Sequence, residues 1–211
     1  HIMRAEVPGP VVGKLVPKIR KTAIILYAVY AVMTLILIVL LCVGDMPLYD
    51  SICHAFGAAG TGGFSIKTEG ISYYNSAYID VVLSIFMLLF GINFNLFYFI
   101  LIKKAKEAFK SEELRWYIII VALATLAIAV NILDQLDQYE NISTALRYAF
   151  FQVSSIITTT GYGTADFALW PAFSQSILVM LMMIGACAGS TGGGLKVSRW
   201  VMSVKAMAGY V

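Results

Sequence analysis

Residues 22–43 form an apolar run that contains no charged side chain. As an α-helix, a run of this length crosses the roughly 30 Å hydrocarbon core of a bilayer. The composition agrees, because only 13% of the residues are charged, whereas soluble domains carry about a quarter. The sequence therefore predicts an all-α membrane protein, with most of its surface in lipid.

Three further apolar runs extend over residues 76–102, 116–133 and 171–184. The last run stops at a glycine-rich stretch, so it is expected to belong to a broken inner helix. An amphipathic stretch, residues 195–210, follows that break. Together the runs predict a multi-pass protein with four spans.

A Thr-x-Gly-aromatic pattern lies between the first and second runs, and again between the third and fourth. Potassium channels use Thr, Val, Gly and Tyr in this order, because backbone carbonyls that line a narrow pore replace the water around the ion. Glycine at the third position permits the backbone geometry that aims those carbonyls inward. The two copies, here called the filter-like segments, are Thr61, Gly62, Gly63 and Phe64, and Thr159, Thr160, Gly161 and Tyr162.

The filter-like segments predict coordination of K⁺ by backbone carbonyls. The hydroxyls of Thr61 and Thr159 are further candidate ligands, and the rings of Phe64 and Tyr162 are expected to brace the segments from behind. The alternative interpretation is a pair of glycine-rich turns between transmembrane helices.

Each filter-like segment follows an apolar stretch that is too short to cross the bilayer, residues 48–60 and residues 144–158. These stretches are interpreted as re-entrant pore helices, because irregular backbone at membrane depth must be buried or line water. Ser143 or Thr144 is the expected cap of the second pore helix. The chain then divides into two parallel helix–pore loop–helix repeats, residues 22–102 and 116–211, related by an axis along the membrane normal.

The basic residues indicate the orientation. Thirteen of the fifteen lie in residues 4–21, in the connection 103–115, or after residue 195. The positive-inside rule assigns all three regions to the cytoplasm. The sequence therefore predicts a plasma (inner) membrane protein with a cytoplasmic N-terminal segment and both filter-like segments on the outer side. Residues 1–3 resemble a cloning scar.

Residues 185–194, here called the glycine loop, interrupt the fourth run at membrane depth. Half of them are glycine, so a continuous helix would be weak. A flexible loop below the second filter-like segment could act as a gate, whereas the alternative is a helix that ends at a cytoplasmic glycine. The residues assigned to the gate are Gly185, Gly189, Ser190, Thr191, Gly192, Gly193 and Gly194.

An enzyme is not expected. Residues 188–192 have a passing likeness to a nucleophile elbow, but no strand precedes them and His54 lies in the other repeat. His54 is instead expected to face a polar neighbour on its pore helix. The net charge of +3 does not indicate nucleic acid, and the chain contains no phosphate-binding motif for an organic cofactor.

Together these motifs resemble the Trk/Ktr potassium uptake family. The matches run through nearly the whole chain, at residues 5–10, 59–65, 91–94, 158–162 and 185–196. The last is the most specific, because it is similar to the intramembrane gating loop in the third repeat of that family. The resemblance implies that this chain corresponds to repeats two and three of four fused channel-like repeats.

By that resemblance, the filter-like segments would supply two quadrants of a potassium filter. It also implies a dimer and a cytoplasmic nucleotide-binding regulatory subunit as partners. Four quadrants are needed, so either the missing repeats lie elsewhere or a second copy completes the pore, and the first arrangement is favoured. The alternative function is a non-conducting fragment or membrane scaffold that needs the missing repeats.

Overall fold

The computed structural model describes residues 19–101, 108–135 and 141–209. Within these ranges all regular elements are helices, which confirms the all-α class. The proposed cloning scar, residues 4–18 of the N-terminal segment and residues 103–107 of the cytoplasmic connection lie outside the described residues.

The first repeat begins with a long helix and a short one, and it then contains a bent pair of helices. Ser76 caps the first helix of the pair, since its hydroxyl accepts a hydrogen bond from the N–H of Ile79 at 3.5 Å. The elements are α2 (Ile19–Val43), α3 (Leu48–Ala59), the 3₁₀ helix η1 (Gly70–Tyr74), α4 (Ala77–Phe90) and α5 (Phe94–Leu101).

The apolar run of residues 76–102 forms two helices instead of one. Helices α4 and α5 meet at an angle of 92°. The break lies at residues 91–93, here called the α4–α5 bend, and its cause is tertiary packing described below.

The second repeat has the same order of long, short and apolar helices. Its short helix begins after Asn141, which makes no side-chain capping bond, so the expected cap at Ser143 or Thr144 was wrong. The elements are α7 (Glu112–Gln135), α8 (Ile142–Ile157), the 3₁₀ helix η2 (Phe167–Leu169), α9 (Ala172–Ile184) and α10 (Val197–Met207).

Two of the described helices are long and apolar enough to cross a membrane, at Ala23–Val43 and Glu112–Asp134. The bent pair α4 and α5 counts as a third if it forms one span. Large apolar side chains on α2 and α7, such as Val39 and Leu123, are exposed. Exposed apolar faces of this kind suit a lipid environment or contact with further protein.

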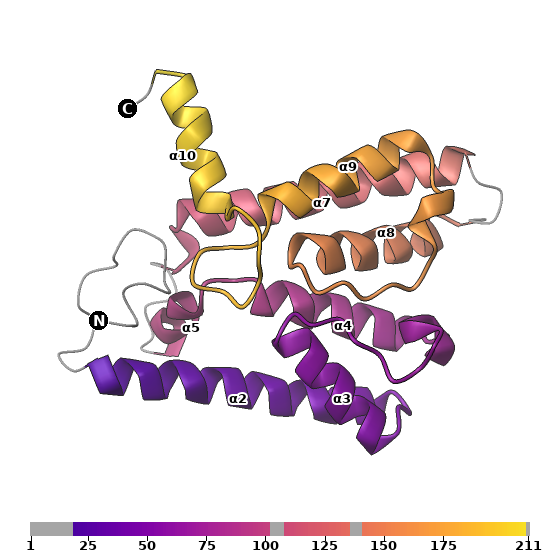
Figure 1. The fold of residues 1–211 in the computed structure, drawn as a ribbon, viewed down its shortest axis with the longest axis horizontal. Helices are drawn as coiled ribbons and strands as arrows, with labels where there is room; N and C mark the ends of the chain where they lie inside the picture. The colour runs from indigo at the N-terminus through magenta and orange to yellow at the C-terminus, as the bar shows by residue number, and fades with distance from the viewer. Residues whose placement is uncertain (1–18, 102–107, 136–140, 210–211) are drawn as a thin grey trace.

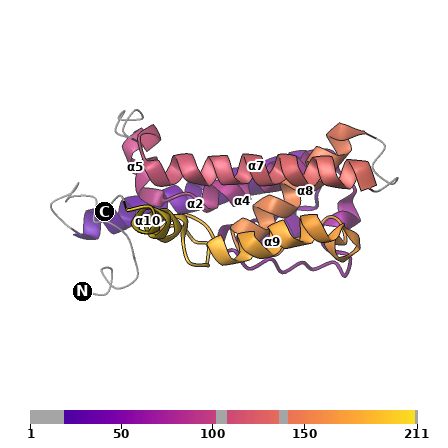
Figure 2. The same cartoon turned by 90° about the horizontal axis from the view of Figure 1, so that it is seen from above.

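The helices pack in layers. In Figure 1, α2 and α3 lie below α4, and α8 separates α4 from α7 and α9, while α10 points away from the other helices. Figure 2, seen from above, shows α7 extending along the length of the molecule. Each repeat has its own apolar core, but Phe151 and Tyr162 of the second repeat enter the core of the first. The two repeats are therefore joined through a side chain of α8 and through Tyr162 of the second filter-like segment.

Candidate ion-conduction site

The two filter-like segments have matching backbone conformations. The φ angle is positive at Thr61 (50°) and Gly63 (67°), and it is again positive at Thr159 (59°) and Gly161 (90°), but not at the residue between each pair. A positive φ is strained for a β-branched residue such as threonine. The same strain at equivalent positions supports the alignment of the two repeats.

Neighbouring amides in each segment converge on one oxygen at the end of the preceding short helix. The N–H groups of Gly62 and Gly63 donate to the carbonyl of Gly57 at 2.7 and 3.4 Å. In the second copy, the N–H groups of Thr160 and Gly161 donate to the carbonyl of Ser155 at 2.9 and 3.4 Å. The chain offsets between donors and acceptor are the same in both copies.

This arrangement decides where the carbonyls point. In a trans peptide the C=O and the N–H lie on opposite sides of the bond, and no cis peptide occurs in the described chain. Because the N–H groups face the helix end, the carbonyls of the same peptides face away from it. Those carbonyls belong to Thr61, Gly62, Thr159 and Thr160.

The two segments lie against each other. A Cβ atom added to Gly63 would collide with the carbonyl oxygen of Thr160, so glycine is required there by space as well as by φ. At the equivalent Gly161 an added Cβ would meet no described atom within 4 Å. The first segment therefore has a neighbour on one side, and the second is open on the corresponding side.

The expected bracing role differs between the two aromatic rings. Tyr162 is 2% exposed, and its hydroxyl lies 3.0 Å from the carbonyl oxygen of His54 and 3.4 Å from that of Phe64. It braces the segments as predicted. Phe64 itself is 85% exposed, so the bracing role of this ring stays a prediction. The two rings differ because Tyr162 packs into the core of the first repeat, whereas no described residue covers Phe64.

A polar network supports the first segment from behind. His54 is buried, and its Nε2 lies 2.9 Å from Oγ of Ser65, which confirms the expected polar neighbour. Its Nδ1 lies 2.7 Å from the carbonyl oxygen of Asp50, and the side chain of Asp50 accepts a hydrogen bond from Tyr74 at 2.6 Å. The pKa of Tyr74 is raised, mainly by partial burial and to a lesser extent by the hydrogen bond to Asp50. The Tyr74 hydroxyl therefore stays protonated and can donate this bond.

The glycine loop contacts the threonines of both filter-like segments. The hydroxyl of Thr61 donates to the carbonyl of Thr191 at 3.1 Å. The N–H of Gly193 donates to the hydroxyl oxygen of Thr159 at 2.7 Å. Ser190 points back into the loop, where its hydroxyl donates to the carbonyl of Cys187 at 2.7 Å. Of the two hydroxyl residues assigned to the gate, Thr191 lies against a filter-like segment and Ser190 is turned away.

The same loop fills the α4–α5 bend. The N–H of Cys187 donates to the carbonyl of Gly91 at 3.0 Å, and the N–H of Phe94 donates to the carbonyl of Gly189 at 3.1 Å. At the bend, a Cβ on Gly91 would collide with the hydroxyl of Tyr117. These bonds replace those of a continuous helix, which explains why the apolar run of residues 76–102 breaks here.

Sequence reasoning missed one residue of this region. Oε1 of Glu113, on the first turn of α7, accepts hydrogen bonds from the N–H of Ala188 at 2.7 Å and the N–H of Ser198 at 3.3 Å. In the sequence, Glu113 is one acid among many charged residues in a polar connection, and no spacing distinguishes it from its neighbour Glu112. Only the fold brings it to the loop.

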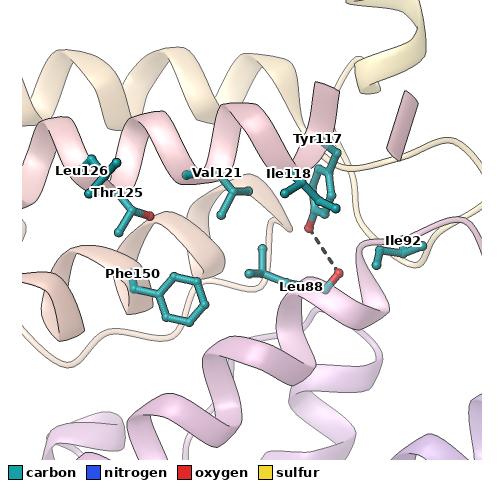
Figure 3. Close-up of a pocket in the computed structure, with 9 residues that line it drawn as sticks. Leu88, Ile92, Tyr117, Ile118, Val121, Thr125, Leu126 and Phe150 are labelled. Carbon is teal, nitrogen blue, oxygen red and sulfur yellow. Dashed lines mark hydrogen bonds between the residues drawn. The ribbon is translucent and has the colours of Figure 1, made fainter. Parts of the chain in front are cut away.

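An apolar hollow lies away from these segments. Figure 3 shows a cavity of about 450 Å³ between α4, α7 and α8, lined by Leu88, Val121, Phe150 and their neighbours. The hydroxyl of Tyr117 at its edge already donates to the carbonyl of Leu88, at 3.3 Å. A cavity of this kind offers space to an apolar group and little to a cation.

Fold and site together define an all-helical membrane protein with two equivalent, carbonyl-presenting segments. The TrkH family, described as cation transport proteins, matches residues 2–208, and the chain belongs to this family. The Trk/Ktr resemblance is thereby confirmed, and with it the expectation that the family is one of transporters rather than enzymes.

Several relatives cover the chain almost completely. It is 36% identical to the Trk system potassium uptake protein TrkH of Salmonella typhimurium, over 97% of this chain and 43% of the relative. It is 32% identical to the Trk system potassium uptake protein TrkG of Escherichia coli, over 97% of this chain and 42% of the relative. The potassium transporter TrkH from Vibrio parahaemolyticus has a similar crystal structure, with a TM-score of 0.85 at 33% identity, covering 93% of this chain and 42% of that one. The chain thus spans less than half the length of these relatives.

Proposed function

We propose that this chain supplies two quadrants of a potassium-selective filter, together with its gate, in a Trk-type potassium uptake protein. The observation that carries the proposal is the shared geometry of the filter-like segments. In both, strained φ angles and paired amide bonds turn the carbonyls of residues 61–62 and 159–160 away from the helix ends. Carbonyls presented in this way can replace the hydration shell of K⁺. K⁺ is then the transported ion, held by backbone oxygens.

A closed filter needs two more quadrants. The space beside Gly161 and the exposed ring of Phe64 are the two open sides of the present pair. We assign these sides to the missing repeats, with a second copy of this chain as the other candidate. A non-conducting scaffold is the alternative function, and it is favoured if neither partner restores ion flux.

The remaining proposals concern orientation and partners. The basic residues place the N-terminal segment and α10 in or near the cytoplasm, with the filter-like segments facing outward. Arg199 and Lys205 on α10 are exposed and are candidate contacts for a cytoplasmic nucleotide-binding regulator. The complete transporter is proposed to be a dimer in the inner membrane.

The test is potassium uptake by cells that lack their own uptake systems and express the full open reading frame encoding this chain. Wild-type protein should restore growth at low K⁺. Gly63→Ser should lower the ratio of K⁺ to Na⁺ uptake at least tenfold, about the factor that a loss of 1.4 kcal/mol in relative ion binding produces, because the new side chain collides with the carbonyl of Thr160.

Gly163→Ser is the matched control, because Gly163 directly follows the second segment, has no positive φ, and would place an added Cβ 4.0 Å from its nearest neighbour, the carbonyl oxygen of Ala165. It should leave the uptake ratio unchanged. An unchanged ratio in Gly63→Ser, at normal protein abundance in the membrane, contradicts the filter assignment.

A further inference from the structure

We propose that Glu113 is a positioning residue that holds the glycine loop in its non-conducting position, so that loss of its carboxylate increases K⁺ flux. This inference rests on the proposed function, since it assumes that the loop is a gate. Glu113 itself touches neither filter-like segment in the described contacts.

The first step is the position of the Glu113 carboxylate. Its Oε1 accepts N–H bonds from Ala188, inside the loop, and from Ser198, in the first turn of α10. One oxygen atom therefore ties together two points that are ten residues apart in the chain. The carboxylate also lies at the N-terminus of α10, where free N–H groups and the helix dipole favour a negative charge.

The second step is what lies between those two points. The chain from Ala188 to Ser198 includes Thr191 and Gly193, the two residues that bond to the filter threonines. It also includes Lys196, which has a φ of 75° and whose ammonium donates to the carbonyl of Gly192. The whole segment that faces the filter-like segments is thus anchored by one side chain of α7.

The third step is the strength of this anchor relative to the others. The described loop contacts with the filter threonines and the α4–α5 bend are hydrogen bonds between uncharged groups. The bonds to Glu113 have a carboxylate acceptor, and bonds of this type are about twice as strong. Without the carboxylate, the equilibrium between the bound and released loop should shift by roughly tenfold towards release.

Glu112 provides the matched control. It precedes Glu113 and also reaches α10, but it binds the exposed ammonium of Lys205, at 2.6 Å, instead of the loop. An exposed ion pair of this kind adds little to stability. Glu112→Gln removes the same charge from the same turn of α7 and leaves the contacts of the loop intact.

The experiment uses the full-length protein reconstituted in liposomes, with two measurements. One is K⁺ flux. The other is the rate at which a maleimide modifies Cys187, which lies in the loop and is 0% exposed, in a background where every other cysteine is replaced by alanine. Glu113→Gln and Glu113→Ala should raise both by about tenfold, while Glu112→Gln should change neither. The ratio of K⁺ to Na⁺ flux should stay constant, because no residue of the filter-like segments is substituted.

Two results would overturn the proposal. An unchanged modification rate of Cys187 in both Glu113 variants would show that the carboxylate does not hold the loop. Faster modification without higher flux would show that holding the loop does not limit conduction. Deletion of residues 192–194 then shows whether the Glu113 proposal or the gate assignment has failed. Higher flux after the deletion supports the gate assignment and rejects only the role of Glu113. Unchanged flux rejects the gate assignment itself.

Discussion

The hydroxyl group of Tyr162 joins the two repeats at the scale of single atoms. It lies within hydrogen-bonding distance of two carbonyls of the first repeat, those of His54 and Phe64, and the ring is buried among residues of that repeat. The aromatic end of each filter-like segment is therefore fixed partly by the other repeat. A symmetrical role for Phe64 is ruled out chemically, because phenylalanine has no hydroxyl to donate.

Tyr162→Phe should preserve the ring packing and lose the hydroxyl. The buried carbonyl of His54 then lacks this donor, so we expect the free energy of unfolding to fall by about 1 kcal/mol. Thermal unfolding of the purified full-length protein would measure the change. Tyr49→Phe is the control. The side chain of Tyr49 is exposed, so the free energy of unfolding of this variant should equal that of the wild type within experimental error. Equal stability of the two variants would contradict the claim that the Tyr162 hydroxyl braces the filter-like segments.

Residue identity alone predicted much of the site but could not predict its neighbours. The Thr-x-Gly-aromatic pattern identified Gly63 and Gly161, because glycine accepts a positive φ. It did not predict the positive φ of Thr61 and Thr159. The bracing by Tyr162 was also predictable. Glu113 and the exposure of Phe64 were not, since both depend on contacts between parts of the chain that are far apart in sequence.

At the scale of elements, the α4–α5 bend links the first repeat to the glycine loop. The loop supplies hydrogen bonds to the backbone at Phe90, Gly91 and Phe94, where a straight helix would use its own. Hydropathy could not reveal this bend, because both arms of the run are apolar. Glycine at position 91 was visible in the sequence, but the hydroxyl of Tyr117 that requires it comes from α7.

Gly91→Ala should destabilise the protein by about 1–3 kcal/mol, the usual effect of overpacking a tight site. The added methyl group meets the hydroxyl of Tyr117 and, at 2.9 Å, the methyl of Thr158. Adding Tyr117→Phe to Gly91→Ala should recover part of the lost stability, because the hydroxyl is removed from the crowded space. The four proteins of this double-mutant cycle can be compared by thermal unfolding. A purely additive cycle would contradict the proposed contact.

At the scale of the whole molecule, two similar units pack side by side with one apolar core each. The order of long helix, short helix and filter-like segment in each unit was predictable from hydropathy and the repeated motif. The angles between elements were not, since they depend on side-chain packing across the two units. The orientation in the membrane remains a prediction from the distribution of basic residues.

That orientation can be tested with single cysteines placed at exposed sites in a cysteine-free protein. Glu69 lies between the first filter-like segment and α4, and Lys110 lies just before α7. A membrane-impermeant thiol reagent should modify Glu69→Cys in intact cells and Lys110→Cys only after permeabilisation. The opposite pattern would invert the topology and with it the outward direction of the filter.

The bond from Tyr162 to His54 has a consequence for biosynthesis. The two residues are 108 positions apart, so the first repeat leaves the ribosome well before the tyrosine that completes it. Until Tyr162 is synthesised, the carbonyl of His54 lacks this hydrogen-bond donor and the core of the first repeat lacks this ring. We therefore expect the first unit to finish packing only after residue 162 has been synthesised, and a ribosome stalled between the two repeats should yield a protease-sensitive first half.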